Sequence, residues 1–397
     1  MKHRIGSSLH HPFRPRAATL ALACALAAGP ALAQAQQNEY RIGVIAPTTG
    51  PVATVGQRQL TTLQWWEKSV NESGGIQGRK IRLIHCNDEA NPERAVTCAR
   101  DLLAQKVVLL LNSSVTGPIR AVMPLVEKGP VMLTPSPNII PAPSTFVFQV
   151  SPSDVHMTQA IANYLKRSNV TKLGMVAATD ASGEVGIASA QEVFPKNGIA
   201  LTTARIDLRA TDASTQLAKL ASADVPVLYS SYSGGAASSV IKSYNNLGLT
   251  QPLIISYANI SDAFVALIKN DLPDRLLGTA VRAVDPALLD ARERQRTEAF
   301  TKGYQAWRKE RIDQLNLIAL GMADVASAVL RDVADPTDAG AVREYLHKTP
   351  VESFQTIRFS PQSHVGMNAD DVAIVELTKD GSWVAAKPVA TGNRAGR

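Results

Sequence analysis

The chain has 397 residues, of which 45% are apolar and 19% charged, the balance of a soluble globular protein long enough for two lobes rather than one compact core. Its formal charge of +7 falls to +3 without residues 1–35, which carry four basic side chains and no acidic one. No run of Lys and Arg with interleaved aromatics remains, so the sequence argues against nucleic-acid binding.

The first 35 residues have the features of a secretory signal peptide. Four basic residues precede an apolar run at 17–28, and small-x-small cleavage sites end at Ala33 and Ala35; the run is too short to span a bilayer. The alternatives are a retained membrane anchor or a lipoprotein modified at Cys24, although Cys24 falls inside the apolar run. We therefore expect residues 1–35 to be removed and the protein to be periplasmic.

After residue 40, short β-rich runs alternate with amphipathic helices. The pattern predicts strands at 41–46, 80–87, 107–112 and 131–134, and helices at 57–72, 92–105 and 119–128. The strand VVLLLN lacks polar alternation, as in a parallel sheet that is covered on both faces. This βαβα order predicts a doubly wound α/β lobe.

A Pro- and Ser-rich stretch at 136–153 leads into a second set of the same kind. Its predicted helices are 154–169, 186–197, 215–221 and 236–247, and its predicted strands are 172–178, 201–207, 225–230 and 253–256. Further helices are expected at 299–307 and 316–332, and a hairpin at 372–378 and 383–387. The predicted fold class is therefore α/β, with two doubly wound lobes.

Two cysteines follow residue 35. Cys86 ends a predicted strand, and Cys98 shares the inward stripe of the next helix with Ala95, Ala99 and Leu102. Because disulfides persist outside the cytoplasm, we expect a Cys86–Cys98 disulfide, with two separate buried thiols as the alternative. No cluster of His or Cys accompanies them, so no metal is expected.

The loops that follow predicted strands are dense in Ser, Thr, Asn and Gly, and open parallel sheets bind ligands at those strand ends. Hydroxyls and backbone N–H groups beside helix N-termini suit a carboxylate. Helix capping is the better explanation for any one loop, but several such loops together favour a ligand cleft. The candidate residues are Asn112, Ser113, Ser114, Ser136, Asn138, Asp180, Ser182, Ser231, Tyr232 and Tyr257.

Signals for catalysis are poor. The chain has no P-loop, G-x-G-x-x-G, H-E-x-x-H or G-x-S-x-G motif. Its histidines after residue 35 are scattered, and no paired carboxylates lie in a strand-end loop. We expect a binding protein without cofactor or metal, and not an enzyme.

The sequence resembles the type I periplasmic binding proteins of the leucine/isoleucine/valine-binding group at 42–56, 74–103, 113–137 and 243–249. The resemblance implies two α/β lobes joined by crossovers near 151–154, 278–285 and 351–359. Lobe 1 would comprise 36–152 plus 285–350, and lobe 2 would comprise 153–284 plus 351–397. It also implies a ligand between lobes that close by a hinge motion, a monomer, and the permease subunits of an ABC importer as partners.

The resemblance assigns Ser113 and Ser114, with Asn112 just before them, to a ligand carboxylate. Ser136 and Asn138 fall in the loop that helps to hold an α-amino group in amino-acid binders, although the Pro137 between them has no N–H to donate.

Two departures from the family pattern concern the ligand. Tyr257 stands where the amino-acid binders commonly place an acidic partner for the ligand ammonium, and Ser182 replaces the usual Tyr of a D-x-x-Y-G motif. Asp180 could still supply a negative charge or could only cap a helix. The expected ligand is a carboxylate with an aromatic or hydrophobic body and no ammonium, stacked by Tyr232 and Tyr257. The alternatives are a branched-chain or other hydrophobic amino acid or amide, a periplasmic sensory receptor, and an exported enzyme.

Overall fold

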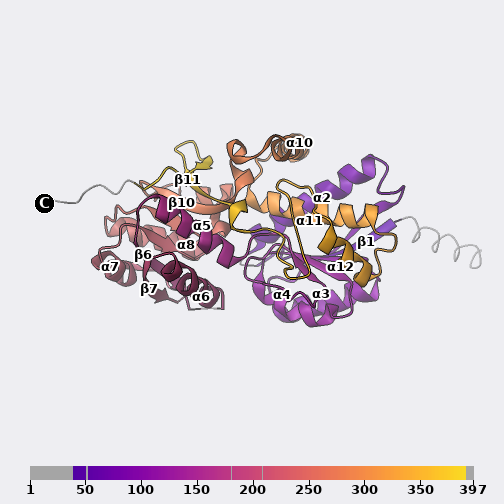
Figure 1. Ribbon diagram of the computed structural model, residues 1–397, viewed down its shortest axis with the longest axis horizontal. Coiled ribbons are helices and arrows are strands. Elements are labelled where there is room, and N and C mark those ends of the chain that lie inside the picture. Colours follow the sequence, from indigo (N-terminus) through magenta and orange to yellow (C-terminus); the bar gives the residue numbers. More distant parts are fainter. Residues whose placement is uncertain (1–38, 51, 180, 208, 390–397) are drawn as a thin grey trace, which may run out of the picture.

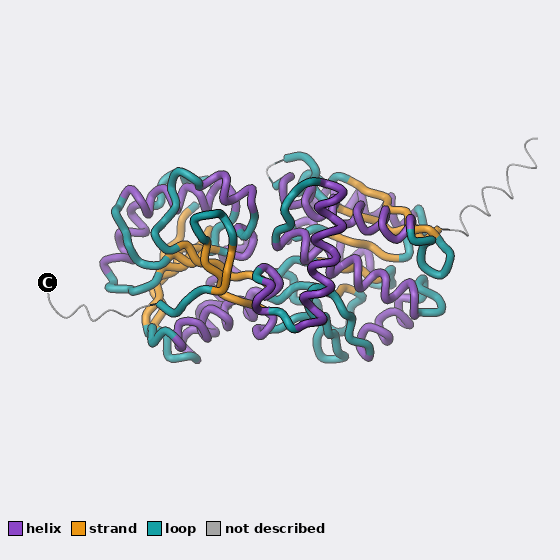
Figure 2. The backbone as a smooth tube through the Cα atoms, turned by 90° about the horizontal axis from the view of Figure 1, so that it is seen from above, coloured by secondary structure: helices purple, strands orange, loops and turns teal. Residues whose placement is uncertain are grey.

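The computed structural model describes residues 39–389 except 51, 180 and 208. The predicted signal peptide and Asp180 therefore lie outside the described residues. The chain forms two lobes placed end to end along the long axis, each with helices around its own sheet (Figure 1). Figure 2 shows the same two lobes from above, meeting at the middle of the molecule.

The first sheet has five parallel strands in the order β2-β1-β3-β4-β5. In the central part of the sheet, Ile42 pairs with Leu83 on one side and with Leu109 on the other. The strand β5 was not predicted. The strands are β1 (Glu39–Ile45), β2 (Lys80–Cys86), β3 (Leu109–Asn112), β4 (Val131–Thr134) and β5 (Val147–Gln149).

Six helices belong to this sheet: α2 (Ala53–Glu72), α3 (Pro92–Ala104), α4 (Thr116–Val122), α10 (Ala291–Arg308), α11 (Gln314–Asp332) and α12 (Ala339–Lys348). One face packs on α3 and α4, with Leu110 in that core, and the other packs on α2, α11 and α12, with Leu109 and Leu111. The strands are apolar throughout because both faces are covered. The helix α10 lies outside α2, where Trp65 and Phe300 stack edge to face at 5.0 Å.

The second sheet has seven strands in the order β12-β11-β10-β9-β8-β6-β7. All neighbours are parallel except β11, which runs antiparallel to both β10 and β12, so the predicted C-terminal hairpin is confirmed. The strands are β6 (Lys172–Ala178), β7 (Ala200–Ile206), β8 (Leu228–Ser230), β9 (Leu253–Ile255), β10 (Leu276–Val281), β11 (Val372–Leu377) and β12 (Trp383–Ala385).

Five helices cover the second sheet: α5 (Asp154–Arg167), α6 (Ala181–Lys196), α7 (Ser214–Ser222), α8 (Gly234–Asn246) and α9 (Asp262–Ile268). The helices α5 and α6 share one core with Met175 and Tyr229, while α7, α8 and α9 share another with Val176 and Leu228. Successive strand residues thus enter opposite cores, and the predicted doubly wound α/β architecture is confirmed in both lobes.

Three segments connect the two sheets, and the third of them differs from the prediction. The first, after β5, leads into α5 as expected. The second follows Val281 and lies within the predicted 278–285. Gly278 itself is inside β10, where a Cβ would sit 2.4 Å from Cδ1 of Ile260, so this glycine marks close packing within the strand.

The third connection lies later in the chain than the predicted 351–359. Phe354 and Ile357 pack in the core of the first sheet, and Val365 bridges Gln149 of β5. The chain crosses between Gly366, whose N–H donates to the Gln149 carbonyl at 2.8 Å, and the start of β11. If the sheets define the lobes, residues 351–366 belong with the five-stranded sheet and not with lobe 2, where we expected them.

A disulfide joins Cys86 at the end of β2 to Cys98 on α3, with a Cα–Cα distance of 5.6 Å, and confirms the predicted pair. It links the edge strand of the first sheet to the helix that covers it. In the part of the chain that the structure describes, no helix combines the length and apolar character that crossing a membrane requires.

Candidate functional site

The turn after β3 is shaped by its own side chains. Asn112 is 1% exposed, and its Oδ1 accepts the Ser113 N–H at 3.0 Å. The same N–H also reaches the carbonyl of Ile45 on β1 at 3.0 Å. Asn112 therefore fixes the path of the backbone, which presents Ser113 and Ser114 at the strand end.

Ser114 is held by Gln59, a residue of α2 that is 1% exposed. The Ser114 N–H donates to Gln59 Oε1 at 3.2 Å, and Gln59 Nε2 donates to the Ser114 hydroxyl oxygen. Because the amide supplies one proton to that oxygen, the Ser114 hydroxyl keeps its own proton for another acceptor. Sequence reasoning missed Gln59, although a polar residue on the buried stripe of α2, with Leu63 and Trp66, was the available signal.

The turn after β4 brings Ser136 beside the first turn. Ser136 is fully buried, and its hydroxyl lies 3.2 Å from that of Thr116 at the start of α4. Asn138 is only partly buried, and its carbonyl accepts a bond from Arg120 at 3.4 Å. Among the described residues, the buried hydroxyl of Ser113 has no hydrogen-bond partner. The two turns thus gather hydroxyl groups at neighbouring strand ends.

Tyr257 reaches these turns from the other sheet. It begins the short helix η2 (Tyr257–Asn259) after β9, and it is 6% exposed. Its hydroxyl donates to the Pro135 carbonyl at 3.4 Å, and its own carbonyl accepts from Gln314 of α11 at 2.8 Å. Burial raises the pKa of Tyr257 to about 12, against a lowering effect of the nearby Ser114 hydroxyl. Tyr257 is therefore a neutral hydrogen-bond donor at physiological pH.

The remaining predicted residues lie in the second lobe. Ser231 donates its N–H and hydroxyl to the Val176 carbonyl, at 3.1 and 3.4 Å, and Ser182 is exposed in the first turn of α6. Tyr232 is 2% exposed, and its hydroxyl donates to the carbonyls of Ala177 on β6 and Ile206 on β7. This placement favours a packing role for Tyr232 over the predicted stacking on a ligand.

These contacts therefore bring Ser114, Ser136 and Tyr257 together at the junction of the two sheets. What these groups offer is a set of neutral hydroxyl groups, of which Ser114 keeps its own proton while the Tyr257 proton is directed to the Pro135 carbonyl. Neutral donors on buried turns stabilise an anion through charge-assisted hydrogen bonds. The arrangement suits the oxygen atoms of an acid.

Comparison with known proteins begins with a family model described as "Periplasmic binding protein", which matches residues 39–382. A protein of Brucella melitensis biotype 1 named "Leu/Ile/Val-binding protein homolog 3" is 25% identical over 363 residues, covering 88% of this chain and 94% of its own length.

Solved structures share the fold at lower sequence identity. A solute-binding protein of an ABC transporter from Rhodopseudomonas palustris, crystallised in complex with benzoate, has a TM-score of 0.70 at 20% identity, covering 89% of this chain and 99% of that one. A leucine-binding protein from Thermotoga maritima has a TM-score of 0.74 at 17% identity, covering 87% and 97%. At these identities the likeness concerns the fold alone.

Proposed function

The chain belongs to the periplasmic binding protein family, and from that premise we propose that it is the extracytoplasmic receptor of an ABC importer for a small carboxylate with an aromatic or hydrophobic body. It would be exported through residues 1–35, act as a monomer, bind the acid between its lobes, and deliver it to the permease subunits of the importer. Binding without chemical conversion is the role expected of it.

The observation that carries this proposal is the meeting of Tyr257 with the serine turns. Tyr257 comes from the seven-stranded sheet, whereas Ser114 and Pro135 come from the five-stranded one. A ligand held by both sides gains contacts only when the lobes are together, which couples binding to lobe closure.

The donors at this junction favour an acid over a zwitterion. Tyr257 stays protonated, since burial raises its pKa to about 12, so it can exchange its 3.4 Å bond to the Pro135 carbonyl for one to a ligand carboxylate but cannot neutralise an ammonium. A buried ammonium without a carboxylate partner would be costly. The buried Ser113 hydroxyl, which lacks a partner among the described residues, would donate a hydrogen bond to a ligand oxygen.

The main alternative is a branched-chain or other hydrophobic amino acid. It is supported by the name of the Brucella relative, which is a Leu/Ile/Val-binding protein homologue. The benzoate complex of the Rhodopseudomonas protein supports the carboxylate instead, because that ligand has no amino group.

Calorimetric titration against benzoate, 4-hydroxybenzoate, leucine and valine separates these two ligand classes. Mass spectrometry of the acid released when the purified protein is denatured extends the search beyond this panel. We expect binding of an aromatic or hydrophobic acid. Micromolar binding of leucine without binding of either benzoate would overturn the assignment.

Two variants test which residues hold the ligand. Tyr257→Phe and Ser114→Ala each remove one donor to a charged acceptor, so we expect each to weaken binding about 10- to 100-fold. Tyr345→Phe is the matched control, because Tyr345 lies on α12 and its hydroxyl donates to Asp332 at the end of α11 at 2.7 Å. Equal affinities for wild type and Tyr257→Phe would remove Tyr257 from the site.

A further inference from the structure

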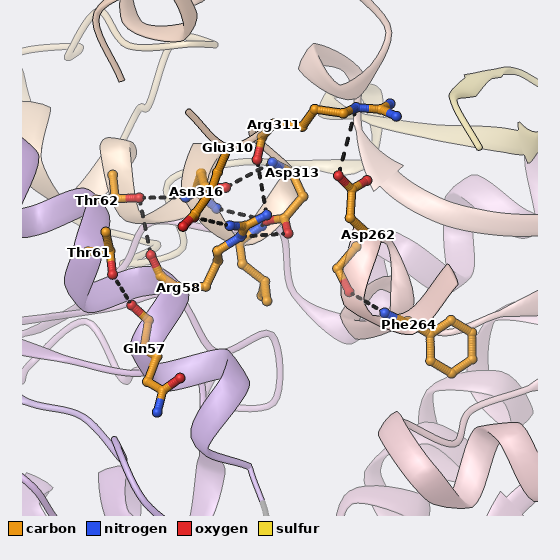
Figure 3. A network of polar contacts seen from close by, with 12 residues as sticks. Gln57, Arg58, Thr61, Thr62, Asp262, Phe264, Glu310, Arg311, Asp313 and Asn316 are labelled. Atoms are coloured by element: carbon orange, nitrogen blue, oxygen red, sulfur yellow. Dashed lines mark hydrogen bonds and ion pairs between the residues drawn. The ribbon is translucent and has the colours of Figure 1, made fainter. Parts of the chain in front are cut away.

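The segment 309–313, between α10 and α11, is fastened to α2 by a single arginine. All three guanidinium nitrogens of Arg58 are used: Nε donates to Asp313 Oδ2 at 3.0 Å, Nη1 to Glu310 Oε2 at 2.8 Å, and Nη2 to the Arg311 carbonyl at 3.0 Å (Figure 3). Asp313 also caps α11 by accepting the Leu315 N–H at 2.9 Å. The backbone of the segment therefore moves with the five-stranded sheet.

The charges of this anchor leave the Arg311 side chain available for other contacts. Arg58 already faces the two carboxylates of Glu310 and Asp313. Arg311 contributes only its carbonyl to the anchor, and its own guanidinium extends away from the Arg58 cluster toward Asp262 (Figure 3). Its side chain is 54% exposed, so the group is not part of a core.

The Arg311 guanidinium reaches the other lobe at two points. Its Nε lies 3.8 Å from Asp262 Oδ2, and its Nη2 donates to the Ser382 hydroxyl at 3.4 Å. Asp262 begins α9, which Ser261 caps through its bond from the Phe264 N–H, and Ser382 lies in the turn between β11 and β12. Both partners move with the seven-stranded sheet.

We propose that Arg311 is a cross-lobe strut that stabilises the lobe arrangement seen in this structure. Rotation of one sheet relative to the other changes the distances from Arg311 to Asp262 and Ser382, because Arg58 holds the strut to the first lobe. Exposed ion pairs of this kind change an equilibrium by about two- to fivefold. The strut thus lowers the fraction of ligand-free protein that adopts other lobe arrangements. This effect does not depend on which ligand the protein binds.

The test measures the distance between lobes without ligand. Nitroxide labels on Lys128→Cys and Lys242→Cys, both exposed, mark the two lobes, and Cys24→Ser leaves only the disulfide-bonded pair besides them. Pulsed electron resonance then gives the distance distribution. We expect Arg311→Gln to lower the ratio of this arrangement to the others about two- to fivefold. We expect 1 M NaCl to lower the ratio of the wild type close to that of the variant, because salt screens the ion pair.

Two further variants keep the test specific. Arg308→Gln removes the same charge one turn earlier, but its ion pair with Glu310, at 3.4 Å, stays inside the first lobe, so its distribution should match wild type. Reversing the pair with Arg311→Asp plus Asp262→Arg should restore the wild-type ratio that Arg311→Asp alone disturbs. A distribution unchanged in Arg311→Gln, or changed equally in Arg308→Gln, would overturn the proposal.

Discussion

At the scale of single residues, the clearest titratable feature is a pair of histidines beside β5. His364 is fully buried and stacks on Phe148 with ring centroids 3.9 Å apart. Its Nδ1 lies 2.9 Å from the Val147 carbonyl, which can only accept, so this nitrogen carries the proton. Its Nε2 then accepts from His347 Nε2 at 2.7 Å. Burial lowers the pKa of His364 to about 4, and the charge of Arg343 acts in the same direction.

This pair predicts a loss of stability in acid. The unfolded histidine titrates near pH 6.5 and the folded one near 4, so between these values the unfolded chain binds more protons. The free energy of unfolding should therefore fall as pH drops from 6.5 to 4, on the order of 2–3 kcal/mol from this group. His364→Asn, which keeps an N–H for Val147, should flatten that part of the profile.

Urea unfolding at closely spaced pH values between 4 and 7 measures the effect of His364. The control is His85→Asn, on the edge strand β2, which leaves the buried pair intact and should keep the wild-type slope. Parallel slopes for wild type and His364→Asn would show that His364 does not govern this window.

Sequence reasoning identified the serine turns but could not decide between the two tyrosines. Both Tyr232 and Tyr257 follow predicted strands, so their local patterns are alike. In the structure the Tyr232 hydroxyl donates to the carbonyls of Ala177 and Ile206, which are 55 and 26 residues away in the sequence. Such long-range partners leave no local signature, and the same holds for Gln59, which is 55 residues from Ser114.

At the scale of elements, periodic helices and most apolar strands were predictable, including short ones such as β4 and β9, but several short elements were missed. The predicted strands at 131–134 and 172–178 match β4 and β6. The strand β5 has three residues and follows a Pro-rich stretch, and β10, which was also missed, contains Gly278, a residue that weakens a strand pattern in sequence. The helix α9 is also short, with seven residues, and the ten-residue α12 was missed as well.

The helices that follow the first strand of each lobe share a packing device. A Cβ on Gly56 of α2 would lie 2.0 Å from the Pro47 carbonyl oxygen, and one on Gly183 of α6 would lie 2.0 Å from that of Ala178. In both lobes the helix therefore approaches the preceding strand end more closely than a side chain allows.

Gly56→Ala should destabilise the first lobe. The methyl group would displace either α2 or the turn after β1, because backbone rather than a flexible side chain occupies the space. We expect the free energy of unfolding to fall by about 1–3 kcal/mol, as measured by urea denaturation. Gly117→Ala on α4 is the matched control, since its nearest neighbour would be Pro92 Cγ at 3.5 Å. An equal loss in both variants would contradict the steric explanation.

At the scale of the whole molecule, two fully buried glutamines join the connections between the sheets. Gln314 accepts the Val281 N–H at 2.8 Å and donates to the Tyr257 carbonyl at 2.8 Å. Gln355 accepts the Ala283 N–H at 3.2 Å and donates to the carbonyl and carboxylate of Asp371, at 3.1 and 3.2 Å. Gln355 thus ties the second connection to the third, so that the two bend together.

The third connection was placed too early from sequence because nothing local distinguishes it. Phe354 and Ile357 are apolar residues that either lobe could have buried, and only their packing against α11 and the first sheet assigns them. The crossing point is set by Gln149, more than 200 positions earlier, through its contacts with Val365 and Gly366.

Gln355, with its bonds to Ala283 and Asp371, forms a clasp between the two connections, and it gives a prediction in which lower pH partly restores the stability that a substitution removes. In Gln355→Glu at neutral pH, a carboxylate replaces the amide N–H groups that faced Asp371, so like charges meet at a buried site and the free energy of unfolding should fall by about 1–3 kcal/mol or more. Burial already raises the pKa of Asp371, and the introduced carboxyl group should likewise titrate above its ordinary value of about 4.3. A raised folded pKa means that this stability is lost as pH rises through that value and regained below it.

Urea unfolding at pH 7.5 and 5 should therefore show partial recovery for Gln355→Glu at the lower pH, since a protonated carboxyl can donate to Asp371. The control Gln355→Leu cannot recover in this way, and a Gln355→Glu protein as stable as wild type at pH 7.5 would mean that the clasp does not hold the two connections together.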